Sequence, residues 1–133
     1  MKISASIKSS FQLHEANVET ENNKKIISIT PKTEGYGSSI NGGELLVLSL
    51  ATCFCNDLYR EATKRNIKID TLEIIVSGEF GGEGEPAKNI TYKVQVQAKE
   101  HSDAQIYDLI EKVDKIAEIH NTLRKGINVE LKK

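Results

Sequence analysis

The run from Asn41 to Asn66, NGGELLVLSLATCFCNDLYREATKRN, constrains the fold of this chain more than any other segment. Its pattern predicts one helix from about Gly43 to Asn66, with Asn41 as its N-cap. For more than two turns before Asn56 the helix has no polar face, and such a helix must be covered on several sides. In a chain of 133 residues a sheet and a second helix supply part of that cover, and a partner subunit is a further source.

Alternating polar and apolar residues predict strands on both sides of this helix. Before the helix, residues 2–8, 12–18 and 26–30 are expected to form a small antiparallel meander. After it, residues 71–80 and 90–98 are expected to form a hairpin. The chain therefore carries strands both before and after its longest helix.

The last third of the chain predicts one more helix and one more strand. Apolar residues at helical spacing indicate a second helix over residues 104–120. A last short strand is predicted from the alternation of Ile127, Val129 and Leu131. The element order is that of a single α+β domain spanning residues 1–133.

Charge and hydropathy exclude several classes of function. The 18 basic and 19 acidic residues give a net charge of −1, which argues against a nucleic-acid-binding protein. No polybasic patch for a membrane surface is present, and the longest apolar run, Leu45 to Ala51, is too short to span a bilayer. The first twenty residues lack the apolar core of a signal peptide, so the cytoplasm is the expected location.

The two cysteines, Cys53 and Cys55, lie where the helix changes from apolar to amphipathic. Residues two apart on a helix differ by about 200° in direction, so the two thiols point to nearly opposite sides and form no disulfide. Each is either a small buried hydrophobic residue or a redox nucleophile. The histidines stand far from both in the sequence, so no zinc quartet forms, and neither a metal nor a cofactor is expected.

Two further polar residues are candidates for the neighbourhood of a reactive thiol. Glu44 stands at the start of the long helix, where a carboxylate also interacts favourably with the helix dipole. His120 ends the second predicted helix, where it either caps the helix at the surface or pairs with a cysteine. Cys53 lies about ten residues inside its helix, so the dipole does little for its thiol and a thiolate there needs a nearby cation or donor.

Two segments, NGGELLVLSLATCFCNDLYREATKRNIKIDTLEIIVSGEF and HNTLRKGINVEL, resemble the central and C-terminal parts of the OsmC/Ohr family. The resemblance implies an intertwined α+β homodimer, in which two long central helices are sandwiched by sheets. It also implies thiol-dependent reduction of hydroperoxides, with an attacking cysteine, a resolving cysteine, and an arginine and a glutamate that position the reacting groups. A dithiol then restores the cysteine pair.

Residue by residue, the resemblance assigns Cys53 to the attacking cysteine. The resolving cysteine would fall near Ala117, but the chain has no cysteine after Cys55. The family's glutamate aligns with Gly43, one residue before Glu44, and no arginine precedes Arg60. A chain with this set of residues would use Cys53 and an external thiol.

Three functions are thus open from the sequence. The first is an OsmC-like hydroperoxide reductase that uses Cys53 alone, with Glu44 and His120 as polar neighbours. The second is a non-catalytic protein of the same fold that binds a small apolar ligand at the dimer interface and keeps an unreactive Cys53. The third is an acyl-transfer enzyme, which requires Cys53 or Cys55 within hydrogen-bond reach of His120.

Overall fold

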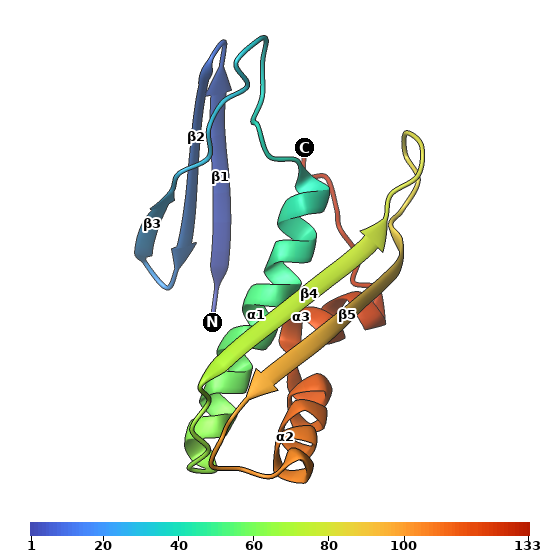
Figure 1. Ribbon diagram of the computed structural model, residues 1–133. Helices are drawn as coiled ribbons and strands as arrows, with labels where there is room; N and C mark the ends of the chain where they lie inside the picture. Colours follow the sequence, from blue (N-terminus) through green and yellow to red (C-terminus); the bar gives the residue numbers. More distant parts are fainter. The chain divides into compact units, whose positions relative to one another are not determined.

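The structure is a computed structural model that describes all of residues 1–133. Contacts within the chain divide it into two units, residues 1–45 and 46–133, and the boundary falls inside the longest helix. The mixed α+β class predicted from the sequence is confirmed, whereas the assignment of residues 1–133 to one domain stays a prediction. The elements, shown in Figure 1, are β1 (Ile3–Ser10), β2 (Leu13–Thr20), β3 (Asn23–Ile27), α1 (Gly42–Lys64), β4 (Thr71–Glu79), β5 (Lys88–Gln97), α2 (Asp103–Ile116) and α3 (Glu118–Lys125).

The N-terminal unit is the predicted antiparallel meander, in the order β1–β2–β3. A two-residue turn, Glu21 and Asn22, joins β2 to β3, and both residues have a positive φ, as the hairpin turn that matches strand twist requires. This tight turn starts β3 at Asn23, earlier than the predicted 26–30. Only Ala16 is buried in the unit, so the sheet has almost no core of its own.

Helix α1 begins with a reciprocal pair of hydrogen bonds between Asn41 and Glu44. The Glu44 backbone N–H donates to Asn41 Oδ1, and the Asn41 backbone N–H donates to Glu44 Oε2, each over 2.8 Å. This is the capping-box arrangement, and it confirms Asn41 as the N-cap. One face of α1 is buried, and residues four apart form it: Leu50, Phe54, Leu58 and Ala62. Leu45 and Leu48, outside this face, stay 38% and 54% exposed.

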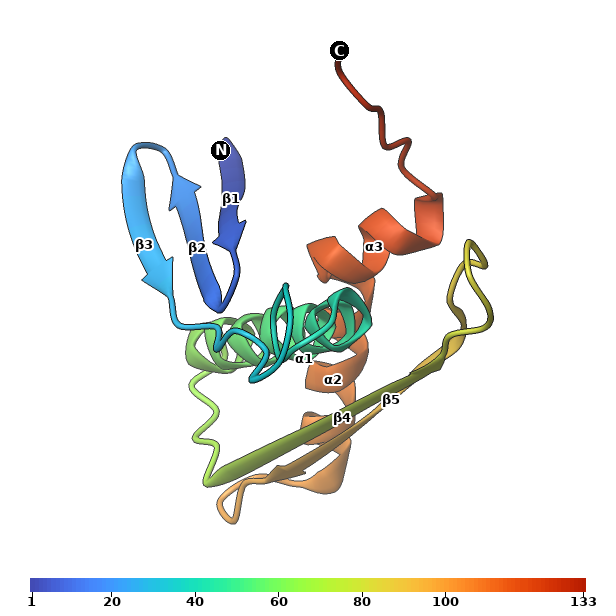
Figure 2. The ribbon, with the colours of Figure 1, turned by 90° about the horizontal axis from the view of Figure 1, so that it is seen from above.

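The hydrophobic core of the second unit lies between α1, the β4–β5 hairpin and α2. Phe54 and Leu58 of α1 meet Leu109 and Val113 of α2 in one buried cluster. The alternating inner residues of β4 and β5 pack against it; the hairpin crosses α1 in the view of Figure 1 and lies to one side of the helix in Figure 2. Strands β4 and β5 pair antiparallel, as predicted. The core therefore holds the second half of α1 in a fixed position.

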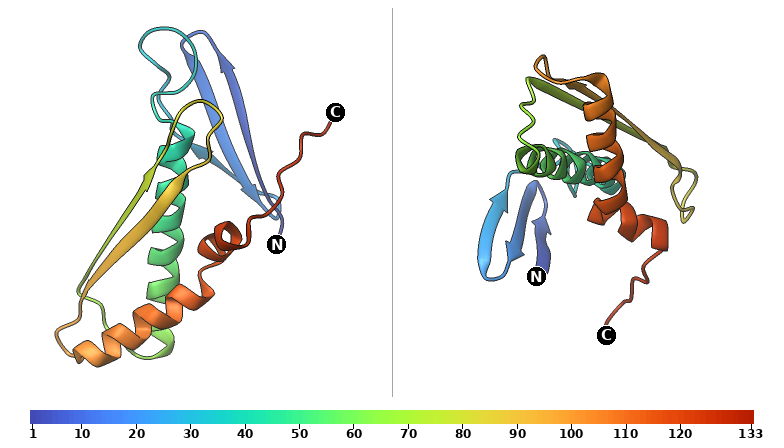
Figure 3. Two further views of the ribbon diagram at one scale, coloured as in Figure 1. Left: turned by 90° about the vertical axis from the view of Figure 1, so that its right-hand side faces the viewer. Right: turned by 90° about the horizontal axis from the view of Figure 1, so that it is seen from below.

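The second predicted helix is in fact two helices, because the chain breaks at Ala117 (Figure 3). Ala117 has φ −63° and ψ 109°, an extended conformation. Side chains of α3 bind the freed carbonyl groups of α2: Asn121 donates to the Lys115 oxygen over 3.0 Å, and Arg124 to the Asp114 oxygen over 2.9 Å. These bonds replace the helical partners that the break removes. A single helix over 104–120 was therefore wrong.

The predicted last strand is absent. After Gly126 the chain has no regular structure, as Figure 2 shows, and Ile127, Val129 and Leu131 are 61%, 93% and 89% exposed. Alternation gives a segment one apolar face, but a strand also needs a neighbouring strand to bind its backbone, and this chain brings none to the tail. None of the helices is long and apolar enough to cross a membrane.

Candidate functional site

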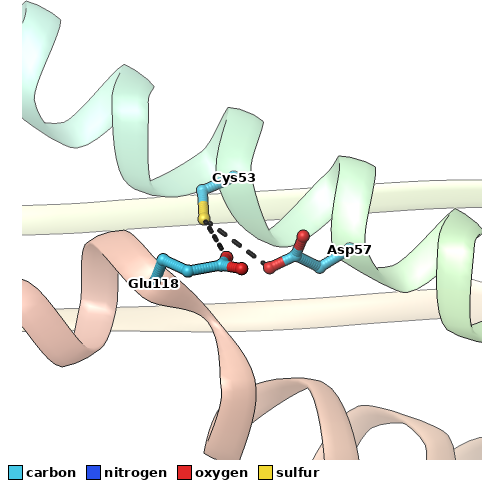
Figure 4. Close-up of side chains that lie close together, drawn as sticks. All are labelled: Cys53, Asp57 and Glu118. Carbon is cyan, nitrogen blue, oxygen red and sulfur yellow. Dashed lines mark hydrogen bonds between the residues drawn. The ribbon is translucent and has the colours of Figure 1, made fainter. Parts of the chain in front are cut away.

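The Cys53 thiol lies between two carboxylates. Its Sγ is 3.7 Å from Asp57 Oδ2 and 4.0 Å from Glu118 Oε2 (Figure 4). Asp57 follows Cys53 by one turn of α1, so the two side chains share a helix face. Glu118 opens α3, and it reaches the sulfur because the chain turns at Ala117. The break between α2 and α3 thus brings Glu118 to the site as its third side chain.

The surroundings of Cys53 keep its sulfur protonated. Burial raises the pKa of Cys53, the backbone N–H of Ile119 opposes this rise, and the charges of Asp57 and Glu118 add to it. A negative charge close to a thiol disfavours the thiolate, whereas activated thiols stand beside cations. The site therefore holds a neutral thiol at neutral pH.

Asp57 is the buried carboxylate of the site, with 4% of its surface exposed. Burial raises the pKa of Asp57, and Glu118 raises it further, while Arg60 works against both. Arg60 Nη1 binds Asp57 Oδ1 over 2.8 Å, which leaves Oδ2 directed at Cys53. Arg60 thus orients the carboxylate and does not contact the sulfur.

The three side chains can serve in two ways. Asp57 and Glu118 offer oxygen atoms that accept the thiol proton when the sulfur reacts. The sulfur and the two carboxylates are also the residues that could hold a metal ion, because their ligand atoms all lie within 4.8 Å of one another. A thiolate with two carboxylates is a ligand set that zinc accepts.

Cys55 lies away from this site. Both cysteines are free, as predicted. Cys55 is half-buried and lines a cavity of about 280 Å³ against β4, whose wall is formed by Ala51, Thr52, Asn56, Leu72 and Ile74. The two thiols therefore meet different surroundings, which follows from their spacing on the helix.

Glu44 does not approach Cys53 within the chain. Its carboxylate is bound to the backbone of Asn41 in the capping box. Nine residues separate it from Cys53 along α1, a rise of about 14 Å. A contact between Glu44 and a thiol would require a second copy of the chain, and this role stays a prediction.

His120 is buried, with 5% of its surface exposed, so the surface capping role was wrong. Its ring packs edge-on against Phe54 and Tyr92, with centroids 5.5 Å and 4.8 Å away. Neither ring nitrogen has a hydrogen-bond partner, so neither cysteine lies within hydrogen-bond reach and a Cys–His pair was wrong as well. His120 lies on the face of α3 that packs against α1 and β5, which explains its burial. Burial lowers the pKa of His120, with a contribution from Arg124.

Asp57 and Glu118 were missed from the sequence for different reasons. The spacing of Cys53 and Asp57, four residues on one helix, places both on one face and was a usable signal. Glu118 carried no such signal, because its approach depends on the break at Ala117.

The family profile described as OsmC-like protein matches residues 35–132. The chain belongs to the OsmC-like family. This confirms the resemblance found in the sequence. No curated protein matches the chain.

Solved structures share the fold at low sequence identity. An OsmC-like protein from Mycoplasma pneumoniae is 21% identical, with a TM-score of 0.62 over 94% of this chain and 87% of that one. An organic hydroperoxide resistance protein OsmC from Legionella pneumophila is 14% identical, with a TM-score of 0.60 over 98% and 95%. The organic hydroperoxide resistance protein OhrB of Bacillus subtilis is 18% identical, with a TM-score of 0.56 over 98% and 96%. At these identities the likeness shows the fold alone.

Proposed function

We propose that this OsmC-like protein is a homodimeric, thiol-dependent hydroperoxide reductase in which Cys53 is the reacting cysteine. The observation that carries the proposal is the position of the Cys53 sulfur between the carboxylates of Asp57 and Glu118. Proteins of the same fold from Legionella pneumophila and Bacillus subtilis are described by their resistance to organic hydroperoxides. A thiol with an adjacent proton acceptor is the minimum that such a reaction needs.

In the first step the Cys53 sulfur attacks one peroxide oxygen, so an S–O bond forms and the O–O bond breaks. The thiol proton passes to the Asp57–Glu118 pair and then to the leaving oxygen. The products are a Cys53 sulfenic acid and an alcohol, with the sulfur oxidised and the peroxide reduced by two electrons. The carboxylates serve here as proton acceptors only, because their charges raise the pKa of the thiol where a neighbouring cation would lower it.

An external dithiol completes the cycle. Cys55 faces the cavity against β4, so it does not reach the sulfenic acid while α1 is intact. One thiol group of the dithiol forms a mixed disulfide with Cys53 and releases water. The second thiol group displaces Cys53, and the dithiol leaves as a disulfide.

Uncovered apolar surface supports the homodimer. All of β1 is exposed, including its apolar residues Ile3 and Ile7. Leu48 of α1 and Val129 of the tail are also apolar and exposed. A stable monomer rarely leaves so much apolar surface in water. A second copy of the chain is the occupant we propose for these surfaces.

A second function is favoured by one observation, the neutral state of the Cys53 thiol. Burial and two carboxylates raise the pKa of Cys53, which suits a residue that does not react. The cavity beside Cys55 has an apolar wall that includes Leu72 and Ile74. In this alternative, the protein binds a small apolar ligand, and Cys53 is a packing residue.

Peroxide consumption separates the two functions. The full-length protein would be mixed with cumene hydroperoxide and dithiothreitol, with Cys53→Ser compared against Cys55→Ser. The proposal expects activity in the native protein and in Cys55→Ser, and loss of activity in Cys53→Ser. Unchanged activity in Cys53→Ser, or none in the native protein, would reject it in favour of ligand binding.

A further inference from the structure

A second cavity lies between the start of β5 and α3, away from Cys53. Its volume is about 300 Å³, at the lower end of the range for ligand pockets. Apolar side chains form much of its wall: Leu50 from α1, Ile90 from β5 and Leu123 from α3. Cys53 does not line it. The cavity therefore fits a compact molecule with an apolar body.

His120 lines this cavity and is its one buried polar side chain without a partner. Both ring nitrogens are buried and unbonded, whereas buried polar atoms are normally hydrogen-bonded. The neighbouring polar groups of the wall are already used. The Tyr92 hydroxyl donates to Asp114, Arg124 Nη2 binds Asp114 over 2.5 Å, and the Asn89 amide donates to Glu79 over 3.1 Å. Thus His120 is the only buried side chain of the wall that has hydrogen-bonding capacity left.

One cation at the cavity has no ion-pair partner. Lys88 also lines it, is exposed, and forms no ion pair. Asp114 neutralises Arg124, so the ammonium of Lys88 is the free charge. An apolar wall, an imidazole free to donate and an unpaired cation together match the two ends of an amphipathic acid.

We propose that this cavity binds a small monocarboxylic acid. The hydrocarbon body lies against Leu50, Ile90 and Leu123, and one carboxylate oxygen accepts the His120 N–H. Lys88 pairs with the carboxylate, so binding satisfies the orphaned ring and the free cation together. The inference does not depend on peroxide reduction, because Cys53, Asp57 and Glu118 do not line this cavity.

The test is a titration of the full-length protein with sodium hexanoate. Binding is monitored through the ring resonances of His120 in nuclear magnetic resonance spectra. Hexan-1-ol and hexylamine serve as neutral and cationic probes of the same length. We expect saturable shifts of His120 with hexanoate, weaker binding of hexanol and none of hexylamine. His14, a half-buried residue of β2 that does not line the cavity, is the internal control and should not shift.

Two variants locate the carboxylate. Lys88→Gln should weaken hexanoate binding by about tenfold or more, the loss expected for one charge-assisted hydrogen bond. His120→Phe keeps an aromatic ring in the core and should weaken it similarly. The matched control is Lys93→Gln, an exposed lysine of β5 outside the cavity, which should bind as the native protein does. The proposal is overturned if native protein shows no saturation, if hexanol binds as tightly as hexanoate, or if Lys88→Gln binds unchanged.

Discussion

The Oδ2 atom of Asp57 lies 3.7 Å from the Sγ atom of Cys53, one helical turn further along α1. A buried carboxylate at this distance opposes loss of the thiol proton and is also the nearest group able to accept it. The reaction proposed for Cys53 would therefore require coupled transfer of that proton rather than a standing thiolate.

Replacing Asp57 with asparagine should change two rates in opposite directions. Alkylation of Cys53 by iodoacetamide should become faster, because removing the negative charge lowers the pKa of the thiol. Hydroperoxide reduction should become slower by about 10²-fold, the low end for loss of a general base. Asp108→Asn, which removes an exposed ion pair with Arg65, is the control and should alter neither rate. If both rates rise in Asp57→Asn, Asp57 only hinders the thiol.

Labelling of Cys53 should depend steeply on pH. Burial and the two carboxylates raise the pKa of the thiol above its ordinary value of about 8.5, so the thiolate fraction is small at pH 7. We expect the labelling rate of Cys55→Ser, in which Cys53 is the only thiol, to rise about tenfold per pH unit through neutral pH. The same protein in denaturant provides the reference. A labelling rate already level at pH 7 would show a thiolate and contradict the electrostatics of the site.

Stability should fall as the pH drops from 7.5 to 5.5. The folded protein lowers the pKa of His120, mainly by burial, so the unfolded chain takes up a proton near pH 6.5 that the folded protein does not. The contribution of His120 to the free energy of unfolding is therefore fully present above that pH and is lost progressively below it. The raised pKa of Asp57 acts in the opposite direction at lower pH, which sets the lower limit of the range.

Urea unfolding of His120→Phe and the native protein at both pH values measures this effect. The decrease in the free energy of unfolding should be smaller in His120→Phe than in the native protein. His14→Asn, which changes a half-buried histidine of β2, should keep the native decrease. Equal decreases in all three proteins would mean that His120 is protonated in the folded state.

The protein should be a dimer whose stability depends on the exposed side of α1. Light scattering after gel filtration should give twice the mass of one chain. Leu48→Glu places a charge on a residue that is 54% exposed in the single chain and should shift the mass toward the monomer. Thr63→Glu, an exposed change on the same helix, should remain dimeric. A native protein that is monomeric at tens of micromolar would rule out a second copy as the cover of these apolar surfaces.

The sequence predicted those parts of the fold that local pattern decides. Asn41 and Glu44 carry a capping signal within four residues, and the structure forms that cap. The spacing of Cys53 and Cys55 required their side chains to diverge, which holds whatever surrounds the helix. The alternation of β4 and β5 likewise follows from which residues face the core.

Tertiary contacts decided the parts of the fold and of the site that the sequence did not predict. Ala117 is a good helix former, so its local sequence gives no sign of the break there, which is stabilised by bonds from Asn121 and Arg124 to α2 carbonyls. Glu118 reaches Cys53, and His120 enters the core, as consequences of that break. The tail at Ile127 has the pattern of a strand, but pairing requires a neighbour that no local pattern supplies.

The role of Cys53 as the reacting cysteine is tested by the mass of the protein after one equivalent of cumene hydroperoxide, without reductant and with dimedone present. EDTA in the buffer keeps Cys53, Asp57 and Glu118 free of metal ions. We expect one dimedone adduct per chain, located at Cys53, in the native protein and in Cys55→Ser, and none in Cys53→Ser. A native protein that consumes no peroxide, or that forms a disulfide between Cys53 and Cys55, would contradict it.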